Sequence, residues 1–318
     1  MTQRCAEIVK TTAGIAGVRD QMDDLLVVIV NWNTSDLLRG CLASLAVATE
    51  GLRVRTVVVD NASTDGSPEM VETDFPWVEL IRNSTNVGYA RANNQALRRY
   101  PAQAKYSLLL NPDTEVPPGT LQAMAGFMES HPEAGIGGCR VVKPDGRLDW
   151  ACKRGRLTPS MLFYKALHLD TLLPHSRRFG AYNLSYLDEN QVHEVGTVVG
   201  AFMMIRRECL EDVGLLDESY FMYGEDADLC YRVNDLGWKV FYAPVGNIVH
   251  YKGQSTGKRS YLMIRHWYSA AWKLYQRRTA PKYPSFVNAL VWGGFWTMCL
   301  GSFAANFFRA TKRVPGRR

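Results

Sequence analysis

The sequence predicts an α/β protein with a mostly parallel central sheet that is flanked by helices. From residue 25 onward, apolar β-branched runs alternate with segments whose apolar residues recur at helical spacing. Polar residues follow the end of each apolar run. The chain has 318 residues, of which 47% are hydrophobic and 21% charged, so it can bury a large core and is neither disordered nor collagen-like.

The first strand is predicted over residues 25–30, a continuous apolar run of the kind that is buried on both faces. Asn31 and Asn33 follow this strand. Thr34 or Ser35 is then expected to cap a helix, because either hydroxyl can accept a hydrogen bond from the first helical turn. The apolar face of this helix comprises Leu37, Leu38, Cys41, Leu42 and Leu45.

Two further strands have the same organisation. The strand predicted over residues 55–59 ends at Asp60, which is followed by a segment rich in turn-forming residues. The strand predicted over residues 77–81 leads to Asn86 and Gly88. Polar side chains therefore follow both strands at their carboxyl ends.

A helix is predicted over residues 89–99, and a fourth strand over residues 106–110 ends at Asn111 and Asp113. The prolines at 117–118 are expected to open another helix, since proline is tolerated in the first turn. The carboxyl ends of parallel strands meet at one edge of a sheet, and ligands bind at that edge in open α/β sheets. We therefore expect a ligand site there.

Two motif absences narrow the function. No GxGxxG motif follows the first strand and no GxxxxGK[ST] motif occurs, which excludes dinucleotide-dependent oxidoreductases and P-loop kinases. The seven cysteines are scattered without a CxxC pair, a pattern that favours a reducing cytosol over a disulfide scaffold or a cysteine-based zinc site.

The net charge of +6 averages two unlike regions. No acidic residue follows Asp235, and the chain beyond it carries 14 of the 37 Lys and Arg residues. The chain up to that point holds 23 basic and 31 acidic residues, a net charge of −8. Binding of a phosphorylated substrate and of an anionic membrane surface would explain why the acidic and basic regions are separate. No motif supports nucleic acid as a partner.

The basic region contains an apolar stretch at residues 286–308 with Trp292 and Trp296. Its length approaches that of a membrane span, but Asn288 and Asn306 interrupt it. Such a segment can also lie in the membrane interface, and a helix pair packed on the protein itself is the alternative. We expect membrane association, with spanning and interfacial arrangements both open.

Residues 1–24 contain four acidic residues and no continuous apolar core. They are therefore interpreted as an N-terminal leader that lacks an export signal. The body of the protein is then expected on the cytoplasmic side of the inner membrane.

Three single residues have two interpretations each. Asp113 lies on an Asn-Pro-Asp turn, which is either an ordinary turn or a ligand for a hard cation such as Mg²⁺ or Mn²⁺. Asp60 either accepts a hydrogen bond from a nucleobase or caps its own turn. His250 ends an apolar run and is either a metal ligand or a structural histidine.

A second acidic group is predicted at the start of a helix. Glu225, Asp226 and Asp228 lie within four residues, where the helix dipole favours carboxylates. Asp228 and Arg232 are four residues apart and can pair along one helix face. Glu225 or Asp226 then remains as a candidate general base, and the alternative is charge that only stabilises the helix N-terminus.

Taken in order, these segments resemble the family 2 glycosyltransferases of the GT-A type, most closely their bacterial rhamnosyltransferase-like branch. The resemblance covers about residues 25–252. The matching segments are residues 28–33, 58–66, 86–94, 110–113, 200–201, 225–228 and 249–250.

The resemblance implies a role for each motif residue. It implies a metal site for Mn²⁺ or Mg²⁺ at Asp113 and His250, a catalytic base at Asp226 with Glu225 beside it, and structural support from Asp228 and Arg232. The residues that it implies for the nucleotide-sugar are Asn31, Asn33, Asp60, Asn86, Gly88, Asn111 and Asp113.

This sequence departs from the family pattern at two positions. Asn111 replaces the first acid of the DxD motif, so the implied metal site rests on fewer carboxylates. Gly196 stands where relatives often carry an acidic residue.

The resemblance also implies the domain organisation. Residues 25–255 would form a GT-A domain with a Rossmann-like sheet. Within it, residues 25–145 would bind the nucleotide-sugar and residues 146–255 the acceptor. Residues 256–318 would form basic and apolar helices associated with the membrane. Residues 149–194 match no motif; they form either an acceptor-specific segment, whose arginines suit a phosphorylated carrier, or a solvated surface loop.

The implied function is an inverting glycosyl transfer in cell-surface polysaccharide synthesis. L-Rhamnose from dTDP-L-rhamnose is the favoured donor group, and a saccharide or polyprenyl-linked saccharide is the acceptor. The alternatives are another UDP- or GDP-sugar donor and a non-catalytic, membrane-bound nucleotide-sugar-binding scaffold. A sugar nucleotidyltransferase would require a loop rich in glycine and arginine after the first strand, where this chain has Asn31 and Asn33.

Overall fold

The computed structural model describes residues 22–251 and 261–308. Most of the predicted leader lies outside these residues. Its last part is not a leader, because Asp23 and Asp24 already belong to the first strand, where each forms an ion pair with an arginine of the neighbouring strand region. The basic residues beyond position 308 also lie outside the described residues.

The first half of the sheet is parallel, as the sequence predicts. Strands β1 (Asp23–Asn31), β2 (Val54–Asp60), β3 (Glu79–Arg82) and β4 (Ala104–Leu110) lie in the order β3-β2-β1-β4. The third strand begins at Glu79, two residues later than predicted. Trp77, which the prediction included, is exposed and precedes the strand.

The second half of the sheet is mixed. Strand β8 (Phe202–Arg206) runs antiparallel between β4 and β6 (Ala134–Val142), and β9 (Lys239–His250) is parallel to β6. The short strands β5 (Thr114–Glu115) and β7 (His193–Glu194) both pair antiparallel with β9. The predicted α/β fold with a helix-flanked central sheet is confirmed, and β8 makes it less uniformly parallel than its first half.

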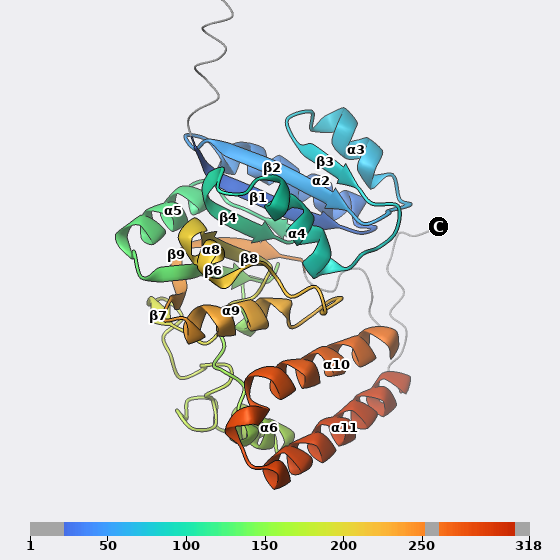
Figure 1. The fold of residues 1–318 in the computed structure, drawn as a ribbon, viewed down its shortest axis with the longest axis vertical. Helices are drawn as coiled ribbons and strands as arrows, with labels where there is room; N and C mark the ends of the chain where they lie inside the picture. Colours follow the sequence, from blue (N-terminus) through green and yellow to red (C-terminus); the bar gives the residue numbers. More distant parts are fainter. Residues whose placement is uncertain (1–21, 252–260, 309–318) are drawn as a thin grey trace, which may run out of the picture.

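Helices pack against this sheet along its whole width (Figure 1). They are α2 (Ser35–Ala48), α3 (Ser67–Asp74), α4 (Tyr89–Arg99), α5 (Thr120–Ser130), α8 (Arg207–Val213) and α9 (Glu225–Asp235). The prediction that the prolines at 117–118 open a helix is wrong by two residues. Gly119 adopts a left-handed conformation and turns the chain, so α5 begins only at Thr120.

A second, smaller apolar cluster lies beside the sheet domain. It is formed by α6 (Pro159–Ala166), α10 (Tyr261–Arg278) and α11 (Ser285–Phe307), which appear together below the sheet in Figure 1. The short helix α7 (Leu169–Leu172) follows α6. Single 3₁₀ turns occur at Trp150–Cys152 and Ala280–Lys282.

A buried carboxylate joins the two parts of the structure. Asp228 on α9 is fully buried, and its two oxygens accept hydrogen bonds from Arg232 at 3.0 Å and from Arg278 on α10 at 2.7 Å. Arg232 also donates to backbone carbonyls of residues 213–215, so the expected pair of Asp228 and Arg232 forms and extends beyond α9. The buried carboxylate is therefore paired with two arginines.

Helix α11 presents an apolar face that nothing in the described residues covers. It is the one helix of residues 22–251 and 261–308 that is long and apolar enough to cross a membrane, and 17% of its most apolar window is buried. The asparagines that interrupt the apolar stretch lie on the inner side. Asn288 accepts a hydrogen bond from Tyr275 on α10, and Asn306 is buried. The outward residues include Phe286, Leu290, Trp292, Leu300 and Phe307.

Candidate active site

Asn31 and Asp60 meet at the carboxyl edge of the parallel strands. The register of β1 and β2 places them opposite each other, and Asn31 Nδ2 donates to Asp60 Oδ1 at 2.8 Å. Asp60 Oδ2 accepts a hydrogen bond from the backbone N–H of Ser63 at 2.8 Å, so Asp60 caps its own turn. Because Asp60 is only 2% exposed, its contact with a nucleobase stays a prediction.

The loops after β1 and β2 are bonded to each other. Asn33 adopts a left-handed conformation, and its Oδ1 accepts a hydrogen bond from the N–H of Thr64 at 2.8 Å. Asp65 accepts from the N–H of Ser35 and so caps α2. Thr34 occupies the N-cap position, but the expected side-chain cap by Thr34 or Ser35 does not form: the Thr34 hydroxyl donates to Asn31, and Ser35 is already the first residue of the helix.

Gly88 lies against the segment that precedes α9. Its φ is +87°, and a Cβ at this position would lie 2.6 Å from the carbonyl oxygen of Phe221. The N–H of Tyr89 donates to that same oxygen at 2.8 Å, while Asn86 accepts from the N–H of Gly88 at 3.0 Å. Only glycine fits at this position, because the backbone of Phe221 lies so close. The close contact packs the half of the domain predicted to bind the nucleotide against the segment that leads to the second acidic group.

Asp113 and His250 come together at the other end of this edge. Residues Thr114 and His250 are paired between β5 and β9, and His250 Nε2 lies 3.2 Å from Asp113 Oδ1. Asp149 lies on the other side of the ring, 3.8 Å from Nδ1. Asn111 contributes its backbone here, donating to the carbonyl of Ala201 at 3.2 Å.

The donor pair of Asp113 and His250 suits a metal that is shared with a substrate. No group of three His, Cys, Asp or Glu side chains in residues 22–251 and 261–308 is arranged to hold a metal ion. Divalent cations at phosphate-transfer sites usually take one or two protein ligands and complete their coordination with phosphate oxygens and water. One carboxylate and one imidazole fit that arrangement. They are too few for a closed structural metal site, in which the protein supplies all the ligands.

Asp226 and Glu225 occupy the first turn of α9 in different surroundings. Asp226 Oδ1 accepts from the N–H of Ala227 at 2.7 Å and Oδ2 from the N–H of Gly200 at 3.1 Å, which fixes the orientation of the carboxylate. Glu225 is buried, and its Oε2 has no hydrogen-bond partner in the described part of the chain. Burial and the negative charge of Asp226 raise the pKa of Glu225 to about 8, so Glu225 carries a proton at neutral pH.

Tyr89 connects the two acidic groups. Its hydroxyl donates to the carbonyl of Gly200 at 3.1 Å, just before strand β8. Burial and the charges of Glu225, Asp226 and Asp113 raise the pKa of Tyr89 well above its usual value. The negative charges of Asp226 and Asp113 therefore both disfavour ionisation of Tyr89.

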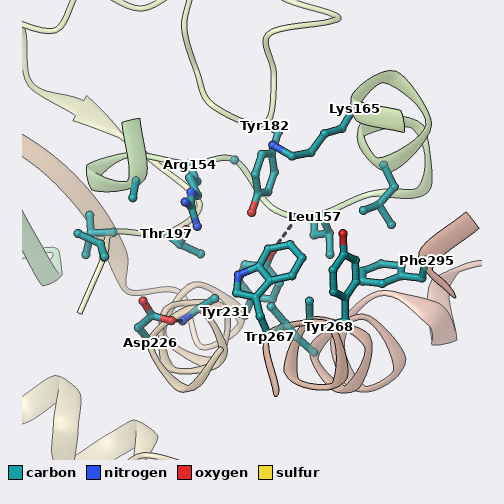
Figure 2. A pocket seen from close by; sticks show the side chains of 18 of the residues that line it. Arg154, Leu157, Lys165, Tyr182, Thr197, Asp226, Tyr231, Trp267, Tyr268 and Phe295 are labelled. Carbon is teal, nitrogen blue, oxygen red and sulfur yellow. Dashed lines mark hydrogen bonds between the residues drawn. The ribbon is translucent and has the colours of Figure 1, made fainter. Parts of the chain in front are cut away.

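A cavity of about 120 Å³ opens beside Asp226 (Figure 2). Asp226 and Tyr231 of α9 form one wall, and α10 and α11 contribute apolar and aromatic side chains to another. The segment of residues 149–194 supplies Arg154, Lys165 and Tyr182. This segment is thus part of the site region rather than only a solvated loop.

The sequence did not reveal this cavity. Residues 256–318 were expected to contact a membrane, yet Trp267, Tyr268 and Phe295 from this region line the cavity together with Asp226. The available signal was the cluster of aromatic residues in segment 261–275, which amphipathic patterning alone does not connect to a distant carboxylate.

The structure explains one departure from the family pattern. A Cβ on Gly196 would lie 2.5 Å from the backbone nitrogen of Arg156 and 2.7 Å from the carbonyl carbon of Gly155. Residues Arg154 and Thr197 form a β-bridge next to this point. An acidic side chain cannot occupy position 196 because the backbone of residues 154–156 already fills its place.

Known protein families match nearly all of the described chain. A family model described as glycosyl transferase family 2 matches residues 26–214, and one described as glycosyl transferase family group 2 matches residues 174–311. The chain is 32% identical over 257 residues to the N-acetylglucosaminyl-diphospho-decaprenol L-rhamnosyltransferase of Mycobacterium tuberculosis, a match that covers 77% of this chain and 82% of that relative.

Two further similarities agree with these matches. The rhamnosyltransferase WbbL of Escherichia coli K12 is 24% identical, with 71% of this chain and 82% of WbbL covered. The mannosyltransferase of Pyrobaculum calidifontis, solved in complex with GDP-Man and Mn²⁺, superposes with a TM-score of 0.56 at 17% identity, covering 90% of this chain and 76% of that chain. This last likeness confirms the predicted fold.

The raised pKa of Glu225 predicts a pH-dependent cost to stability. A carboxyl that titrates near 4.5 when unfolded and near 8 when folded holds its proton more tightly in the folded protein. The unfolding free energy therefore falls as pH rises from 4.5 through 8. Glu225→Gln removes this titration. The unfolding free energy of the variant, relative to that of the unmodified protein, should therefore increase by about 1–3 kcal/mol as the pH rises from 5 to 8.

Chemical denaturation at several pH values measures this difference. Glu211→Gln is the control, because Glu211 lies on the surface of α8 and its side chain is half exposed. Its stability curve should stay parallel to that of the unmodified protein. A parallel curve for Glu225→Gln as well would show that Glu225 is ionised in the folded state.

Proposed function

The chain belongs to glycosyltransferase family 2, and on that premise we propose that it transfers L-rhamnose from dTDP-L-rhamnose to a polyprenyl-diphosphate-linked saccharide in cell-surface polysaccharide synthesis. The sugar and the acceptor class are those in the printed name of the M. tuberculosis relative. The observation that carries the proposal is the position of Asp226, which lines the cavity beside α10 and α11 and accepts a hydrogen bond from Gly200, the residue whose carbonyl accepts from Tyr89. A base in that position can reach an acceptor on one side and a donor on the other.

The nucleotide of the donor is placed at the carboxyl edge of the parallel strands. Asn31, Asn33 and Asp60 lie on the two bonded loops after β1 and β2. Asn86 and Gly88 form the adjoining segment, and Asn111 follows β4. Their convergence at the edge where α/β sheets bind ligands supports the assignment of residues 25–145 to the nucleotide-sugar and of residues 146–255 to the acceptor.

Asp113 and His250 would hold a Mn²⁺ or Mg²⁺ ion, together with the phosphates of the donor. When bound, such an ion neutralises the charge that develops on the departing nucleoside diphosphate. The 3.2 Å separation of Asp113 Oδ1 and His250 Nε2 supports a shared role for the two side chains.

Asp226 would act as the general base. Its carboxylate accepts the proton of the acceptor hydroxyl while the hydroxyl oxygen forms the new bond to the anomeric carbon. The bond from that carbon to the diphosphate oxygen breaks on the opposite face, so one displacement inverts the configuration. The protonated Glu225 next to Asp226 limits the pair to a single negative charge at neutral pH, and the N–H groups of Gly200 and Ala227 hold the base in place.

We place the outer face of α11 in the interface of the inner membrane, on its cytoplasmic side. The two asparagines of the helix contact or face the protein, and its outward residues are apolar, including Trp292. A helix that packs on α10 along one side and is apolar on the other suits an interfacial position. The 14 positive charges after Asp235 would add attraction to anionic lipids.

A donor panel with the purified full-length protein tests the proposed activity. dTDP-L-rhamnose should be the preferred donor for transfer to a short-chain polyprenyl-diphosphate-linked N-acetylglucosamine. Asp226→Asn should reduce transfer by about a hundredfold to ten-thousandfold, the usual loss on removal of a general base, and it should leave the Kd for dTDP-L-rhamnose nearly unchanged. Rates are measured by chromatography of the product and Kd by calorimetry.

Asp235→Asn is the matched control, because Asp235 lies at the far end of α9 and pairs with Arg156 near the surface. It should retain transfer. If the protein transfers a UDP- or GDP-linked sugar faster than L-rhamnose from dTDP-L-rhamnose, the proposed donor is wrong. If Asp226→Asn keeps full activity, Asp226 is not the base. Full activity in excess chelator would contradict the proposed metal site.

The membrane proposal predicts that α11 binds lipid through its outward leucines. The double variant Leu290→Gln, Leu300→Gln should bind anionic vesicles at least about tenfold more weakly, because burying a leucine contributes about 1.5–3 kcal/mol. Sedimentation with phosphatidylglycerol vesicles measures this binding. Leu172→Gln is the control, since Leu172 is equally exposed but lies on α7. Equal binding by all three proteins would place the lipid contact elsewhere.

A further inference from the structure

Two cationic side chains face the cavity beside Asp226, and nothing in the proposed function uses them. Arg154 forms a β-bridge with Thr197, and Lys165 lies in the last turn of α6. Both side chains reach toward Tyr182: the guanidinium carbon of Arg154 lies 5.5 Å from the ring centroid and Lys165 Nζ lies 5.0 Å from it. Figure 2 shows the three side chains above Asp226 in the same cavity.

These two cations have a single acidic side chain between them in the described residues. Within residues 22–251 and 261–308, Arg154 forms no ion pair, and its buried Nε has no hydrogen-bond partner. Lys165 has one acidic neighbour, Asp170, at 3.9 Å. Burial lowers the pKa of Lys165; Asp170 partly opposes this, and the charge of Arg154 lowers it further. Two positive charges therefore repel each other inside a partly buried site, which costs free energy unless an anion binds there.

Nearby arginines of the same segment are satisfied or lie outside the cavity. Arg156 pairs with Asp235 at 2.7 Å, and Arg178 donates to the hydroxyl of Tyr164 at 2.8 Å. Arg177 is exposed and does not line the cavity. Among the cations of this segment that line the cavity, Arg154 is therefore the one without an acidic partner in the described residues, and Lys165 lies beside the same ring with Asp170 as its single acidic partner.

The remaining wall of the cavity is apolar. Trp267, Tyr268, Phe295 and Met298 come from α10 and α11, the helices that carry the apolar outward face. In Figure 2, Arg154 and Lys165 lie above the cavity, and Asp226 and the aromatic side chains of α10 lie below it. A ligand that contacts all three groups of side chains carries a hydroxyl, a phosphate group and a hydrocarbon chain.

We propose that Arg154 and Lys165 bind the diphosphate of the lipid-linked acceptor, present its sugar hydroxyl to Asp226 and direct the start of its hydrocarbon chain along α10 and α11. This inference rests on the proposed function, because it assigns the acceptor of the same reaction. The donor also carries a diphosphate. Neither the residues assigned to the nucleotide nor the proposed metal ligands Asp113 and His250 line this cavity. The acceptor is therefore favoured over the donor as the source of the anion.

Steady-state kinetics with two acceptors test the assignment. One is a short-chain polyprenyl-diphosphate-linked N-acetylglucosamine, and the other is a neutral alkyl N-acetylglucosaminide of matched chain length. Arg154→Gln and Lys165→Gln should each raise KM for the charged acceptor about tenfold to a hundredfold, since a charge-assisted hydrogen bond contributes roughly 1.5–3 kcal/mol. KM for the donor and turnover of the neutral acceptor should change little.

Two further variants separate charge from structure. Arg154→Lys keeps the charge but loses the planar guanidinium, so it should restore part of the preference for the charged acceptor. Arg177→Gln removes an exposed arginine of the same segment and should leave the preference unchanged. If Arg154→Gln raises KM for the donor instead, or weakens both acceptors equally, the proposal is overturned.

A binding measurement keeps this proposal separate from the proposed reaction. Farnesyl diphosphate is titrated into the detergent-solubilised full-length protein by calorimetry, with farnesol as the neutral probe. The unmodified protein should bind the diphosphate at least about tenfold more tightly than farnesol, and Arg154→Gln and Lys165→Gln should each reduce that margin. This result can hold even if the donor panel selects another sugar. Equal binding of the two probes by the unmodified protein would overturn the anion site regardless of the donor.

Discussion

The rest of the structure depends on the position of the first turn of α9. Three separate parts of the chain hold it there: the Gly88 segment contacts the carbonyl of Phe221 just before the helix, the N–H of Gly200 donates to Asp226, and Arg278 of α10 reaches the buried carboxylate of Asp228. Each contact joins a different functional region to the same helix end. The nucleotide edge, the candidate base and the C-terminal helices are therefore placed relative to one another by a single element rather than by a flexible linker.

This arrangement explains why two adjacent carboxyl groups have different properties. Glu225 points into protein that offers no hydrogen bond to its Oε2, and burial together with the neighbouring charge favours its protonated form. Asp226 faces the cavity and is oriented by two backbone N–H groups. The same helix that carries Asp226 is bonded to α10, so the candidate base and the apolar C-terminal helices are held by one element. A membrane-bound acceptor approaching along α11 would then meet the base without further rearrangement.

The sequence predicted what depends on local pattern. Strands β1, β2 and β4 are continuous apolar runs that are buried on both faces, and residues such as Asn31, Asp60 and Asp113 follow them directly, so their convergence follows from the parallel topology. What it could not predict depends on packing between distant segments. The antiparallel entry of β8, the exclusion of a side chain at Gly196 by residues 154–156, and the cavity that Arg154 shares with Asp226 arise only when the chain is folded. Asn288 illustrates the same limit: it seemed to weaken an apolar stretch, yet it faces α10.

The central claim is that one carboxylate, Asp226, deprotonates an acceptor that attacks the donor from the face opposite its diphosphate. Of the other two carboxyl groups in the first turn of α9, Glu225 is buried and protonated, and Asp228 is buried and held by Arg232 and Arg278, so neither is placed to form a covalent sugar intermediate. The anomeric configuration of the product, determined by NMR and compared with that of the nucleotide-sugar donor, tests this claim most directly. The account predicts inversion. Retention of the donor configuration would contradict it, since retention requires a double displacement or a front-face attack that this site is not built to support.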